Sequence, residues 1–503
     1  MKAFSRKASL IIVAVFALTL LLAACGNNDN DNDGGTTNQT TTQTDVPTPP
    51  APPADVDPTD VDEYYGVESD PPVRAAGIHE PRDLGGQVLR IGSWWEGTLA
   101  FAWDGEEPDP AEAQNYFIDR LIWDNSQRVL QEFNFTLEEV ILEYEYMLET
   151  LTASVMAGDA FADIILLSGG MQLSAIRGDL IQPLDSLGLA NSDILGPQVY
   201  SHVFLHAFGH PWAFWDNRPE ANGMFMGVNL DLINAIGAQN PVDLFNNGQW
   251  TWDAALDIMR LATRDTTGDG LMDQFGVAGQ PGDIAFNLMG ANDAPMVSDD
   301  LQYAFDHPNS IRTLEFIDAI FREGLWQYDR AHAPDFNNWG VNFWAFHEGN
   351  AAMFPAATWA MNDGDLPFEF AALPFPLGPD NTSGNVRLTG WDQALVIPHA
   401  SRWNGADVLM VYEEFSAWPG DEPELMIEDG LGWPRGIFLT EDDVQRVVYV
   451  GRHTNRDLGM VIPEYSWVLN QFIEYFANNE MTVLQAVETH RGPRQEMIDN
   501  FFR

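Results

Sequence analysis

A run of nine residues from Asp265 to Asp273 has the residue types and the spacing of a calcium-binding loop. Oxygen-bearing side chains recur at alternate positions, a glycine stands at the sixth position, and the seventh position offers a backbone carbonyl. A hard cation such as Ca²⁺ takes six or more oxygens around one point, and this alternation brings them together. The sequence therefore predicts a structural calcium site with ligands from Asp265, Thr267, Asp269, Leu271 and Asp273.

The loop departs from a full EF-hand pattern in two places. Its third position is Thr267 instead of Asp or Asn, and its twelfth position is Gly276, so no bidentate Glu completes the shell. A more distant acid would then supply the last ligands. The alternative interpretation is an acidic Asp-Gly turn without an ion. Under both interpretations the role is structural, because the loop offers no open coordination position and no adjacent base.

Tryptophan is the second residue type that indicates chemistry, with 17 copies in 503 residues. Several copies stand at predicted strand ends or in turns rich in Gly and Pro. An indole ring packs flat against the C–H face of a sugar, while acids, amides and arginines pair with its hydroxyls. The alternative for any single Trp is core packing, but it weakens for loop tryptophans beside acids. The predicted ligand-binding residues are Trp94, Trp95, Glu96, Trp215, Asp216, Trp359, Trp391, Asp392, Trp433 and Arg435.

Other chemical patterns are weak or missing. His202, His206 and His210 would share one face of a helix and bind zinc, but Gly209 and Pro211 interrupt that helix. Solvated or hydrogen-bonded histidines are therefore the preferred interpretation. The sequence has no G-x-S-x-G, no H-E-x-x-H and no phosphate-binding glycine loop. A glycosidase stays as an alternative, because 75 acidic residues offer too many carboxylate pairs to discriminate.

The first 25 residues have the pattern of an export signal. Lys2, Arg6 and Lys7 give a positive start, and the apolar run from Leu10 to Leu22 is too short to span a bilayer. Small residues then precede Cys25, which is the only cysteine of the chain. The pattern resembles a bacterial lipobox and predicts that Cys25 carries lipid. The alternative is an ordinary signal peptide with an incidental cysteine.

The charge balance excludes several partners. The chain has 24 basic and 75 acidic residues, for a formal net charge of −51. Such a surface repels nucleic acid and anionic lipid headgroups, and it argues against a strongly anionic ligand. Lys2 and Lys7 are the only lysines, so no lysine beyond the export signal can act as a base or form a Schiff base. With a single cysteine the chain has no internal disulfide.

Residues 26–84 are rich in Asn, Asp, Thr and Pro, and they predict a disordered tether. The remaining residues, 85–503, are too many for one ordinary core and suit two lobes. Predicted strands alternate with predicted helices, which favours an α/β fold with a mostly parallel sheet. Ligands bind beyond the carboxyl ends of strands in such sheets. This places Trp94, Trp95 and the turn Ser168–Gly170 near a cleft.

The expected elements follow from the apolar patterns. Strands are expected at 87–93, 135–142, 163–167, 224–229, 351–354, 368–373 and 394–398. Helices are expected at 116–133, 146–157, 230–237, 252–263, 405–418, 466–478 and 481–502.

At this point a family resemblance enters. The block Asn247–Asp253, followed by an apolar helix and by Asp265–Gly276, closely resembles family 1 extracellular solute-binding proteins. That family includes maltose-binding protein and lipoprotein receptors for oligosaccharides. Further matches lie in the expected order along the chain, at Gly158–Ile165, Asp179–Asp185, Gly349–Trp359 and Leu373–Pro376.

The resemblance implies a two-lobe fold of the type II periplasmic-binding-protein kind, hinged around a ligand cleft. Lobe 1 is expected at about residues 85–215 and 385–435, and lobe 2 at about 222–378 and 438–503. The chain would cross between lobes near 208–224, 376–391 and 433–438.

The resemblance also carries a ligand role to Trp94 or Trp95 and to Trp359, and hinge-side positions to Trp391 and Trp433. The segment 204–219, rich in His and Trp, departs from the family pattern and leaves the ligand's identity open.

The function implied is that of a monomeric, lipid-anchored receptor on the outer face of the cytoplasmic membrane. It would capture a carbohydrate, expected to be an oligosaccharide, and deliver it to the permease subunits of an ABC importer. It would not be an enzyme. The alternatives are a secreted polysaccharide-active glycosidase lipoprotein and a surface adhesion lipoprotein, and a peptide or another solute also stays open as the ligand.

Overall fold

The computed structural model describes residues 77–95, 107, 116–187, 210–214, 223–327, 345–358, 361, 363–389, 393–417, 434–462 and 464–502. By the contacts among its residues the chain divides into two units, 1–56 and 57–503, and every described residue belongs to the second. The predicted export signal, Cys25 and the predicted tether as far as residue 76 lie outside the described residues. No helix in the described parts is long and apolar enough to cross a membrane.

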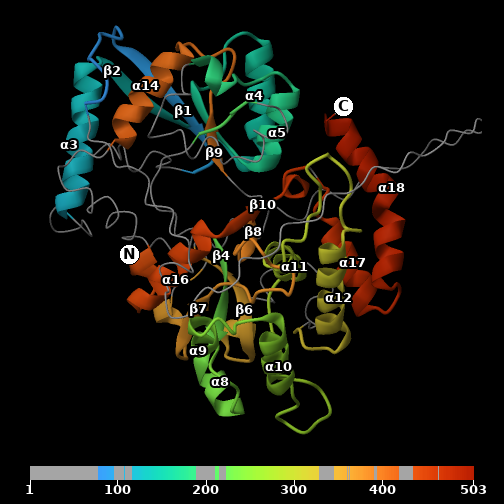
Figure 1. Ribbon diagram of the computed structural model, residues 1–503. Coiled ribbons are helices and arrows are strands. Elements are labelled where there is room, and N and C mark those ends of the chain that lie inside the picture. Colours follow the sequence, from blue (N-terminus) through green and yellow to red (C-terminus); the bar gives the residue numbers. More distant parts are fainter. Residues whose placement is uncertain are drawn as a thin grey trace, which may run out of the picture. The chain divides into compact units, whose positions relative to one another are not determined.

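The first sheet has four strands in the order β2-β1-β3-β9 (Figure 1). β1 (Gln87–Ser93) pairs in parallel with β2 (Phe135–Ile141) and with β3 (Ile164–Leu167). β9 (Ala394–Val396) runs antiparallel to β3 and returns to this sheet from far along the chain. The carboxyl ends of three neighbouring strands therefore meet at one edge, where α/β proteins commonly bind ligands.

Both faces of the first sheet are covered. Side chains of β3 alternate between two apolar cores, because successive residues of a strand point to opposite faces. Ile164 and Leu166 pack in one core with α3 and α14, and Ile165 and Leu167 pack in the other with α4 and α5. The helices around this sheet are α3 (Tyr116–Glu132), α4 (Met147–Met156), α5 (Gly169–Arg177) and α14 (Gly405–Ser416), with short 3₁₀ turns η2 (Tyr144–Tyr146) and η3 (Leu184–Leu187).

Residues 77–84, which the sequence assigns to the tether, belong to the fold instead. The N–H groups of Gly77 and His79 donate to the carboxylate of Glu414 on α14, at 3.0 and 2.6 Å. The N–H of Leu84 donates to the carbonyl of Phe133 at 2.9 Å, and Leu84 is buried. Because residues 26–84 are mostly polar, their composition does not reveal these few contacts. The fold therefore starts earlier than the predicted residue 85.

The second sheet also has four strands, in the order β5-β6-β4-β7. β5 (Phe275–Val277) is parallel to β6 (Ala351–Ala357). β4 (Met224–Asn229) runs antiparallel to both β6 and β7 (Phe370–Leu373). This sheet is therefore mixed rather than mostly parallel, because β4 runs antiparallel to both of its neighbours.

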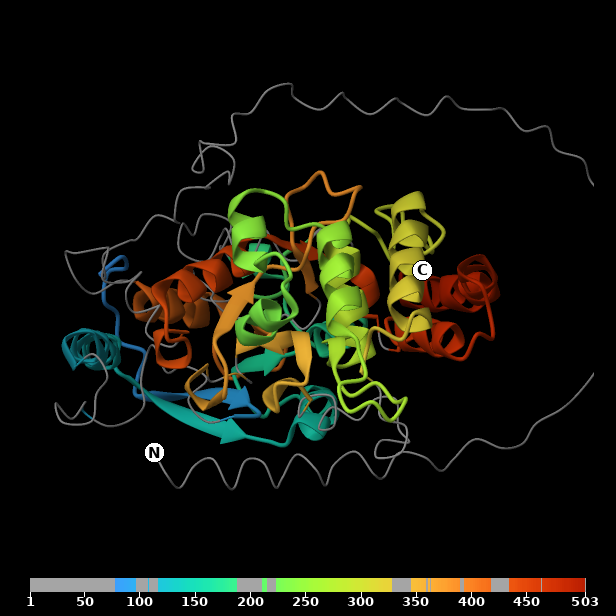
Figure 2. The ribbon, with the colours of Figure 1, turned by 90° about the horizontal axis from the view of Figure 1, so that it is seen from below.

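Helices pack on both faces of the second sheet as well. On one face α8 and α10 pack against the strands, and α12, α17 and α18 lie side by side next to α11 (Figures 1 and 2). On the other face α16 packs against β7. The helices around this sheet are α8 (Leu230–Ile236), α9 (Pro241–Asn246), α10 (Trp252–Ala262), α11 (Pro281–Gly290), α12 (Pro308–Arg322), α16 (Glu441–Arg452), α17 (Val468–Ala477) and α18 (Val483–Phe502), with 3₁₀ turns η6 (Asp363–Asp365) and η7 (Leu458–Met460).

The chain passes between the two sheets three times. It leaves the first sheet after Phe214, which bridges Leu395, and enters the second at β4. It returns between β8 (Arg387–Thr389) and β9, and β8 pairs in parallel with β10 (Thr454–Arg456). The third passage lies between α14 and Phe438, which belongs to the core of the second sheet. All three passages fall in or near the crossings that the resemblance implies.

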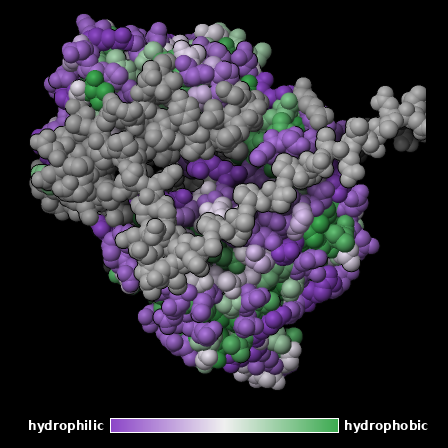
Figure 3. Space-filling model, in the orientation of Figure 1, coloured by the Kyte–Doolittle hydropathy of each residue, from purple (hydrophilic) through white to green (hydrophobic). Residues whose placement is uncertain are grey.

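The described surface agrees with the composition. Figure 3 shows hydrophilic side chains over most of the coloured face, with small and separate apolar patches. Arginines pair with acids throughout, as in the ion pairs Arg260–Glu323 at 2.7 Å and Arg402–Asp159 at 2.7 Å. The acidic excess is therefore only partly neutralised locally.

Candidate functional site

An aromatic cluster stands at the carboxyl end of β1. The ring of Trp94 makes edge-to-face contacts with Trp95, at a centroid distance of 5.6 Å, and with Tyr144, at 5.3 Å. The turn that presents these rings is held by Ser93, whose hydroxyl accepts from the N–H of Trp95 at 3.2 Å and whose carbonyl accepts from the N–H of Leu142 at 2.9 Å. Three aromatic rings thus gather where the strand ends.

The cluster is tied to the neighbouring strand. The hydroxyls of Tyr144 and Ser168 lie 2.9 Å apart, and Ser168 follows β3 and immediately precedes α5. Ser168 is buried, whereas Tyr144 is 43% exposed and Trp95 is 39% exposed. Trp94 is half-buried and packs against both cores of the first sheet, so Trp95 offers the more accessible indole. The predicted gathering of Trp94, Trp95 and the Ser168 turn at one sheet edge is what the structure has.

In the second sheet, the carboxyl end of β5 leads directly into α11. Gly279 has a positive φ of 117°, and a Cβ there would lie 2.6 Å from the ring of Pro355 on β6. Its carbonyl accepts from the indole N–H of Trp326 at 2.8 Å. Pro281 then occupies the first turn of α11, where a missing N–H costs nothing. The turn therefore brings Asp283 to the sheet edge in a fixed position.

Asp283 lies in the first turn of α11, and no described residue donates a hydrogen bond to its carboxylate. The side chain keeps part of its surface accessible, yet the atoms around it remove most of the water. This burial raises the pKa of Asp283 to about 7. A carboxyl group with a raised pKa and no protein partner is a marker of a functional site.

Two amide oxygens near Asp283 also lack donors among the described residues. Asn287, one turn along α11, donates through Nδ2 to the carbonyl of Asp283 at 2.7 Å, which leaves its buried Oδ1 without a partner. Asn470 on α17 lies against Gly282, where a Cβ would come within 2.6 Å of its Oδ1, and that oxygen is also unpaired. Buried acceptors are nearly always paired, so these two oxygens are expected to accept hydrogen bonds from a group outside the described residues.

Asp283, Asn287, Asn470 and Tyr144 are candidate site residues that the sequence reasoning missed. The signal for Asp283 was present as an acid in the first turn after Gln280-Pro281-Gly282 at the end of a short strand. A missing donor is a tertiary property, however, and no pattern in the sequence reports it.

The predicted ligand-binding residues divide into two groups. Trp94, Trp95 and Arg435 are described, and the remaining seven lie outside the described residues: Glu96, Trp215, Asp216, Trp359, Trp391, Asp392 and Trp433. Arg435 makes a forked pair with Glu441 at the start of α16, with N···O distances of 2.9 and 3.1 Å. This pairing holds the pKa of Glu441 below its usual value. The ligand role of each of these residues stays a prediction.

The predicted histidine group is described only at His210, since His202 and His206 lie outside the described residues. The Nδ1 atom of His210 lies 2.7 Å from the carboxylate of Asp185, as expected for a hydrogen-bonded histidine.

The predicted calcium loop is closed by its own acids. The carboxylate of Asp265 accepts from the N–H groups of Gly270 and Gly268, at 2.7 and 2.6 Å. The carboxylate of Asp273 accepts from the N–H and the hydroxyl of Thr266, at 2.8 and 2.9 Å. These bonds hold the pKa values of both carboxyls below their usual range.

The remaining predicted ligands lie on the same exposed loop. Thr267 donates to Asp265, and the carboxylate of Asp269 accepts from the N–H of Leu271 at 2.9 Å. In the described residues no group of three or more His, Cys, Asp and Glu is arranged to hold a metal ion. Calcium binding at Asp265, Thr267, Asp269, Leu271 and Asp273 therefore stays a prediction.

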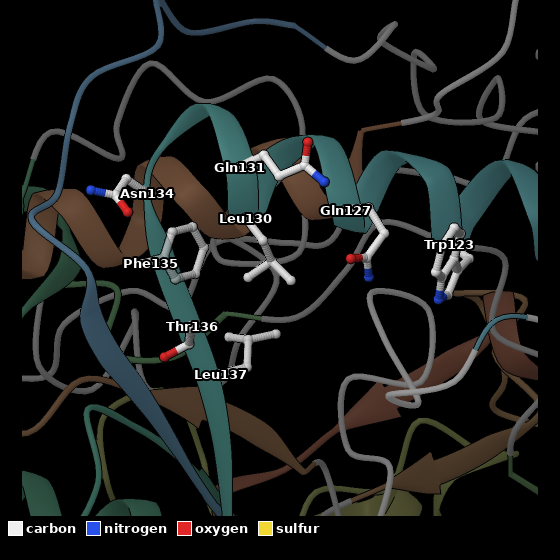
Figure 4. A pocket seen from close by; sticks show the side chains of 8 residues that line it. All are labelled: Trp123, Gln127, Leu130, Gln131, Asn134, Phe135, Thr136 and Leu137. Carbon is white, nitrogen blue, oxygen red and sulfur yellow. The ribbon is translucent and has the colours of Figure 1, made fainter.

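A separate pocket of about 610 Å³ lies between α3 and β2 (Figure 4). Its strand residues, Phe135 to Leu137, stand at the amino end of β2, whereas the aromatic cluster stands at the carboxyl ends of the strands. The pocket is therefore distinct from the strand-end site. Its lining is Trp123, Gln127, Leu130, Gln131, Asn134, Phe135, Thr136 and Leu137.

Two α/β sheets joined by three passages of the chain, with aromatic and hydrogen-bonding groups at their strand ends, define a two-lobe solute-binding protein. The sequence matches the family described as bacterial extracellular solute-binding protein over residues 139–406. The chain belongs to this family, which confirms the resemblance and the fold predicted from the sequence. Membership indicates a place of action outside the cytoplasm. A search of curated protein sequences gave no match.

Three solved structures illustrate the fold. UspC of M. tuberculosis shares 17% identity at a TM-score of 0.56, over 82% of this chain and 100% of that one. The cyclic alpha-maltosyl-1,6-maltose binding protein of Arthrobacter globiformis shares 16% at 0.56, over 83% and 100%. The sugar-binding protein MalE of Xanthomonas citri shares 13% at 0.56, over 82% and 98%. At these identities the likeness shows the fold alone.

Proposed function

We propose that this protein is a carbohydrate receptor of an ABC importer, which captures an uncharged oligosaccharide outside the cytoplasm and hands it to permease subunits. The observation that carries the proposal is the cluster of Trp94, Trp95 and Tyr144 at the carboxyl ends of parallel strands. Accessible aromatic rings there provide a stacking surface for the C–H face of a sugar.

Three further observations support the carbohydrate. Unpaired acceptor oxygens at the start of α11 suit a ligand rich in hydroxyl donors. The net charge of −51 disfavours an anionic solute. Two of the solved structures with this fold are named for maltosyl-maltose binding and for sugar binding.

The role proposed is binding without turnover. Membership of a family of solute-binding proteins supports this role, and the sequence has none of the common hydrolase motifs. Release to the permease would be driven by ATP hydrolysis in separate subunits.

We also propose that Cys25 carries the lipid that holds a monomeric receptor on the outer face of the cytoplasmic membrane. The loop Asp265–Asp273 would bind Ca²⁺ as a structural ion.

The test is a binding screen by tryptophan fluorescence and calorimetry against mono- and oligosaccharides, amino acids and short peptides. We expect saturable binding of an oligosaccharide and no cleavage on prolonged incubation. Trp95→Ala should weaken binding at least tenfold, while Leu484→Ala, an exposed apolar residue of α18, should not. Binding of peptides but no sugar would overturn the proposal, as would cleavage of a sugar polymer at catalytic rates.

A further inference from the structure

The start of α11 is a place where acceptors outnumber donors. The carboxylate of Asp283 and the side-chain oxygens of Asn287 and Asn470 have no donor among the described residues. Burying an acceptor without a partner is unfavourable by about 1–3 kcal/mol. Three such acceptors near one helix turn lower the stability of the fold. A bound solute that supplies hydrogen-bond donors would satisfy them.

Two candidate donors of the protein use N–H groups elsewhere and do not pair with the carboxylate of Asp283. The Nδ2 group of Asn287 is already used by the carbonyl of Asp283 and by the sulfur of Met224, at 2.7 and 3.6 Å. The guanidinium of Arg387, the cation of the adjacent strand β8, is bonded through Nε to the hydroxyl of Thr454 at 2.7 Å. No hydrogen bond from either side chain to the carboxylate of Asp283 is present among the described residues, so a bound solute is the source of donors that we consider.

The helix itself prepares the carboxylate to receive such donors. Asp283 occupies the first turn of α11, where the free N–H groups of the helix favour negative charge. Gly282 has no side chain, so α17 packs closely, and Pro281 fixes the entry of the helix. The side chain keeps part of its surface accessible although the atoms around it remove most of the water, which suits a ligand-orienting group.

We propose that Asp283 determines solute specificity by accepting hydrogen bonds from a pair of donors on the bound solute, so that hydroxyl- or amine-bearing solutes are selected and anionic ones rejected. This rests on the proposed function, and it names the chemistry of the solute edge that faces α11. The side-chain oxygens of Asn287, one turn along α11, and of Asn470, which lies against Gly282, add further acceptors near the start of this helix.

A coupling to protons follows from this assignment. In the free protein, burial raises the pKa of Asp283 to about 7. Solute donors favour the ionised carboxylate and therefore lower its pKa in the complex. Binding then releases a proton near pH 7, and affinity is highest above the free-state pKa and falls as the pH drops through it.

Charged groups on the elements packed against α11 do not set this titration. Burial is the sole cause of the raised pKa of Asp283. The charged residues on those elements, which are α12, α17, β8 and β10, are Arg312, Glu315, Asp318, Arg322, Glu474, Arg387 and Arg456.

The first experiment measures binding by calorimetry at pH 5.5 and pH 8.5. The probes are maltotriose and cellotriose as neutral trimers, a glucosamine trimer as the amine-bearing one, and a galacturonate trimer as the anionic one. With the neutral trimer that binds, we expect tighter binding at pH 8.5, by about tenfold for each unit by which the solute lowers the pKa of Asp283. Buffers of different ionisation enthalpy at pH 7 should report the release of up to about half a proton, because the free carboxyl is only about half protonated at that pH.

The second experiment compares Asp283→Asn with Asp253→Asn, which changes an exposed acid in the first turn of α10. Asp283→Asn should bind the neutral trimer more weakly and with no dependence on pH, while Asp253→Asn should match the wild type. The glucosamine trimer binding more tightly than the neutral one would identify an amine as the donor, and the reverse would identify hydroxyls.

The outcomes separate the two proposals. If no saccharide binds the wild type at either pH, the proposed function falls and this inference falls with it. If a saccharide binds but Asp283→Asn keeps the affinity and the pH profile of the wild type, only this inference is overturned. Tight binding of the galacturonate trimer would overturn it as well. Should Asp283→Asn fail to fold, the absence of proton release by the wild type decides against it.

Discussion

At the scale of single residues, Asp163 is a buried acid that groups from several parts of the first sheet contact. Its fully buried carboxylate pairs with Arg90, through Nε and Nη2 at 3.0 Å each. It also accepts from the hydroxyl of Ser401 and the N–H of Arg402, both at 2.9 Å. One side chain thus joins β1, β3 and the residues that precede α14.

We predict that Asp163→Asn lowers the free energy of unfolding by about 3–5 kcal/mol, because it leaves the buried guanidinium of Arg90 without its counter-charge. Denaturant titration followed by circular dichroism measures the change. The matched control is Asp159→Asn, since Asp159 pairs with Arg402 on the surface, and exposed pairs contribute about 0–1 kcal/mol. Equal effects of the two substitutions would contradict the assignment.

The calcium loop yields a second prediction at this scale. Millimolar Ca²⁺ should raise the melting temperature relative to EDTA, because an ion that binds only the folded state stabilises it by mass action. Asp265→Asn should abolish that rise, since Asp265 occupies the first position of the predicted loop and holds Gly268 and Gly270 in place.

Asp257→Asn, a change in an exposed acid of the neighbouring α10, should leave the calcium response intact. An unchanged melting temperature of the wild type on adding Ca²⁺ would reduce the loop to an acidic turn. Its internal hydrogen bonds already provide a structure for that alternative.

At the scale of elements, the segment 77–84 packs against α14 and α3, and the acid Glu414 accepts two of its backbone hydrogen bonds. The buried carboxylate of Glu414 accepts from the N–H groups of Gly77 and His79 and from the guanidinium of Arg128, the last at 2.6 Å. The His79 ring adds a contact with Glu413, also at 2.6 Å. The start of the fold is therefore fixed on the helical layer of the first sheet.

We predict that Glu414→Gln frees this segment, because the amide cannot replace a carboxylate that takes two backbone donors and a guanidinium. Hydrogen exchange at Gly77 and His79 should speed up, and the free energy of unfolding should fall by about 1–3 kcal/mol. Glu132→Gln is the control, since Glu132 also pairs with Arg128 but is exposed. Unaltered exchange at both amides would show that other contacts hold the segment.

Several elements with a clear apolar period were predicted from the sequence, although the amphipathic helices α12 and α16 were missed. β4 lies at the predicted residues, and α10 and α17 differ from expectation by one or two residues at an end. By contrast, α11 was missed because eight of its ten residues are buried, so no polar face marks it as a helix. β8 and β10 have three residues each, too few for any period.

The candidate site was predictable only in part, for a related reason. Trp94 and Trp95 follow a strand, and strand ends are visible in sequence. The hydrogen bond between Tyr144 and Ser168, and the lack of donors at Asp283, arise from segments far apart in the chain. Whether such a side chain has a hydrogen-bond partner depends on the folded structure, so the local sequence does not report it.

For the molecule as a whole, three passages of the chain between the sheets restrict the motions that ligand capture can use. One of them directly follows β8, whose partner β10 comes from beyond α16. At this junction Arg387 lies against Gly223, where a Cβ would come within 2.4 Å of the guanidinium carbon. A closure of the two lobes around a ligand would have to accommodate this close contact.

Net charge is the property of the whole chain with the most direct physical consequence. With a formal charge of −51, the acidic side chains repel one another in the folded state. Only 24 basic residues are available to offset 75 acidic ones. Several described arginines are already used in pairs, such as Arg322 with Asp318 at 2.7 Å. The unpaired excess of acids acts over the whole surface and is accessible to salt.

We therefore predict that the melting temperature rises between 0.05 and 1 M NaCl, because the Debye length falls from more than about 10 Å to about 3 Å and screens the repulsion among the acids. Differential scanning calorimetry at pH 8 measures the rise, with sucrose at matched osmolality as a control for excluded-solute effects. Acidification toward pH 5 should reduce the salt dependence, since protonation begins to remove the same charges. A melting temperature that is unchanged or lower at 1 M NaCl would mean that local pairing by arginine already balances the acidic surface.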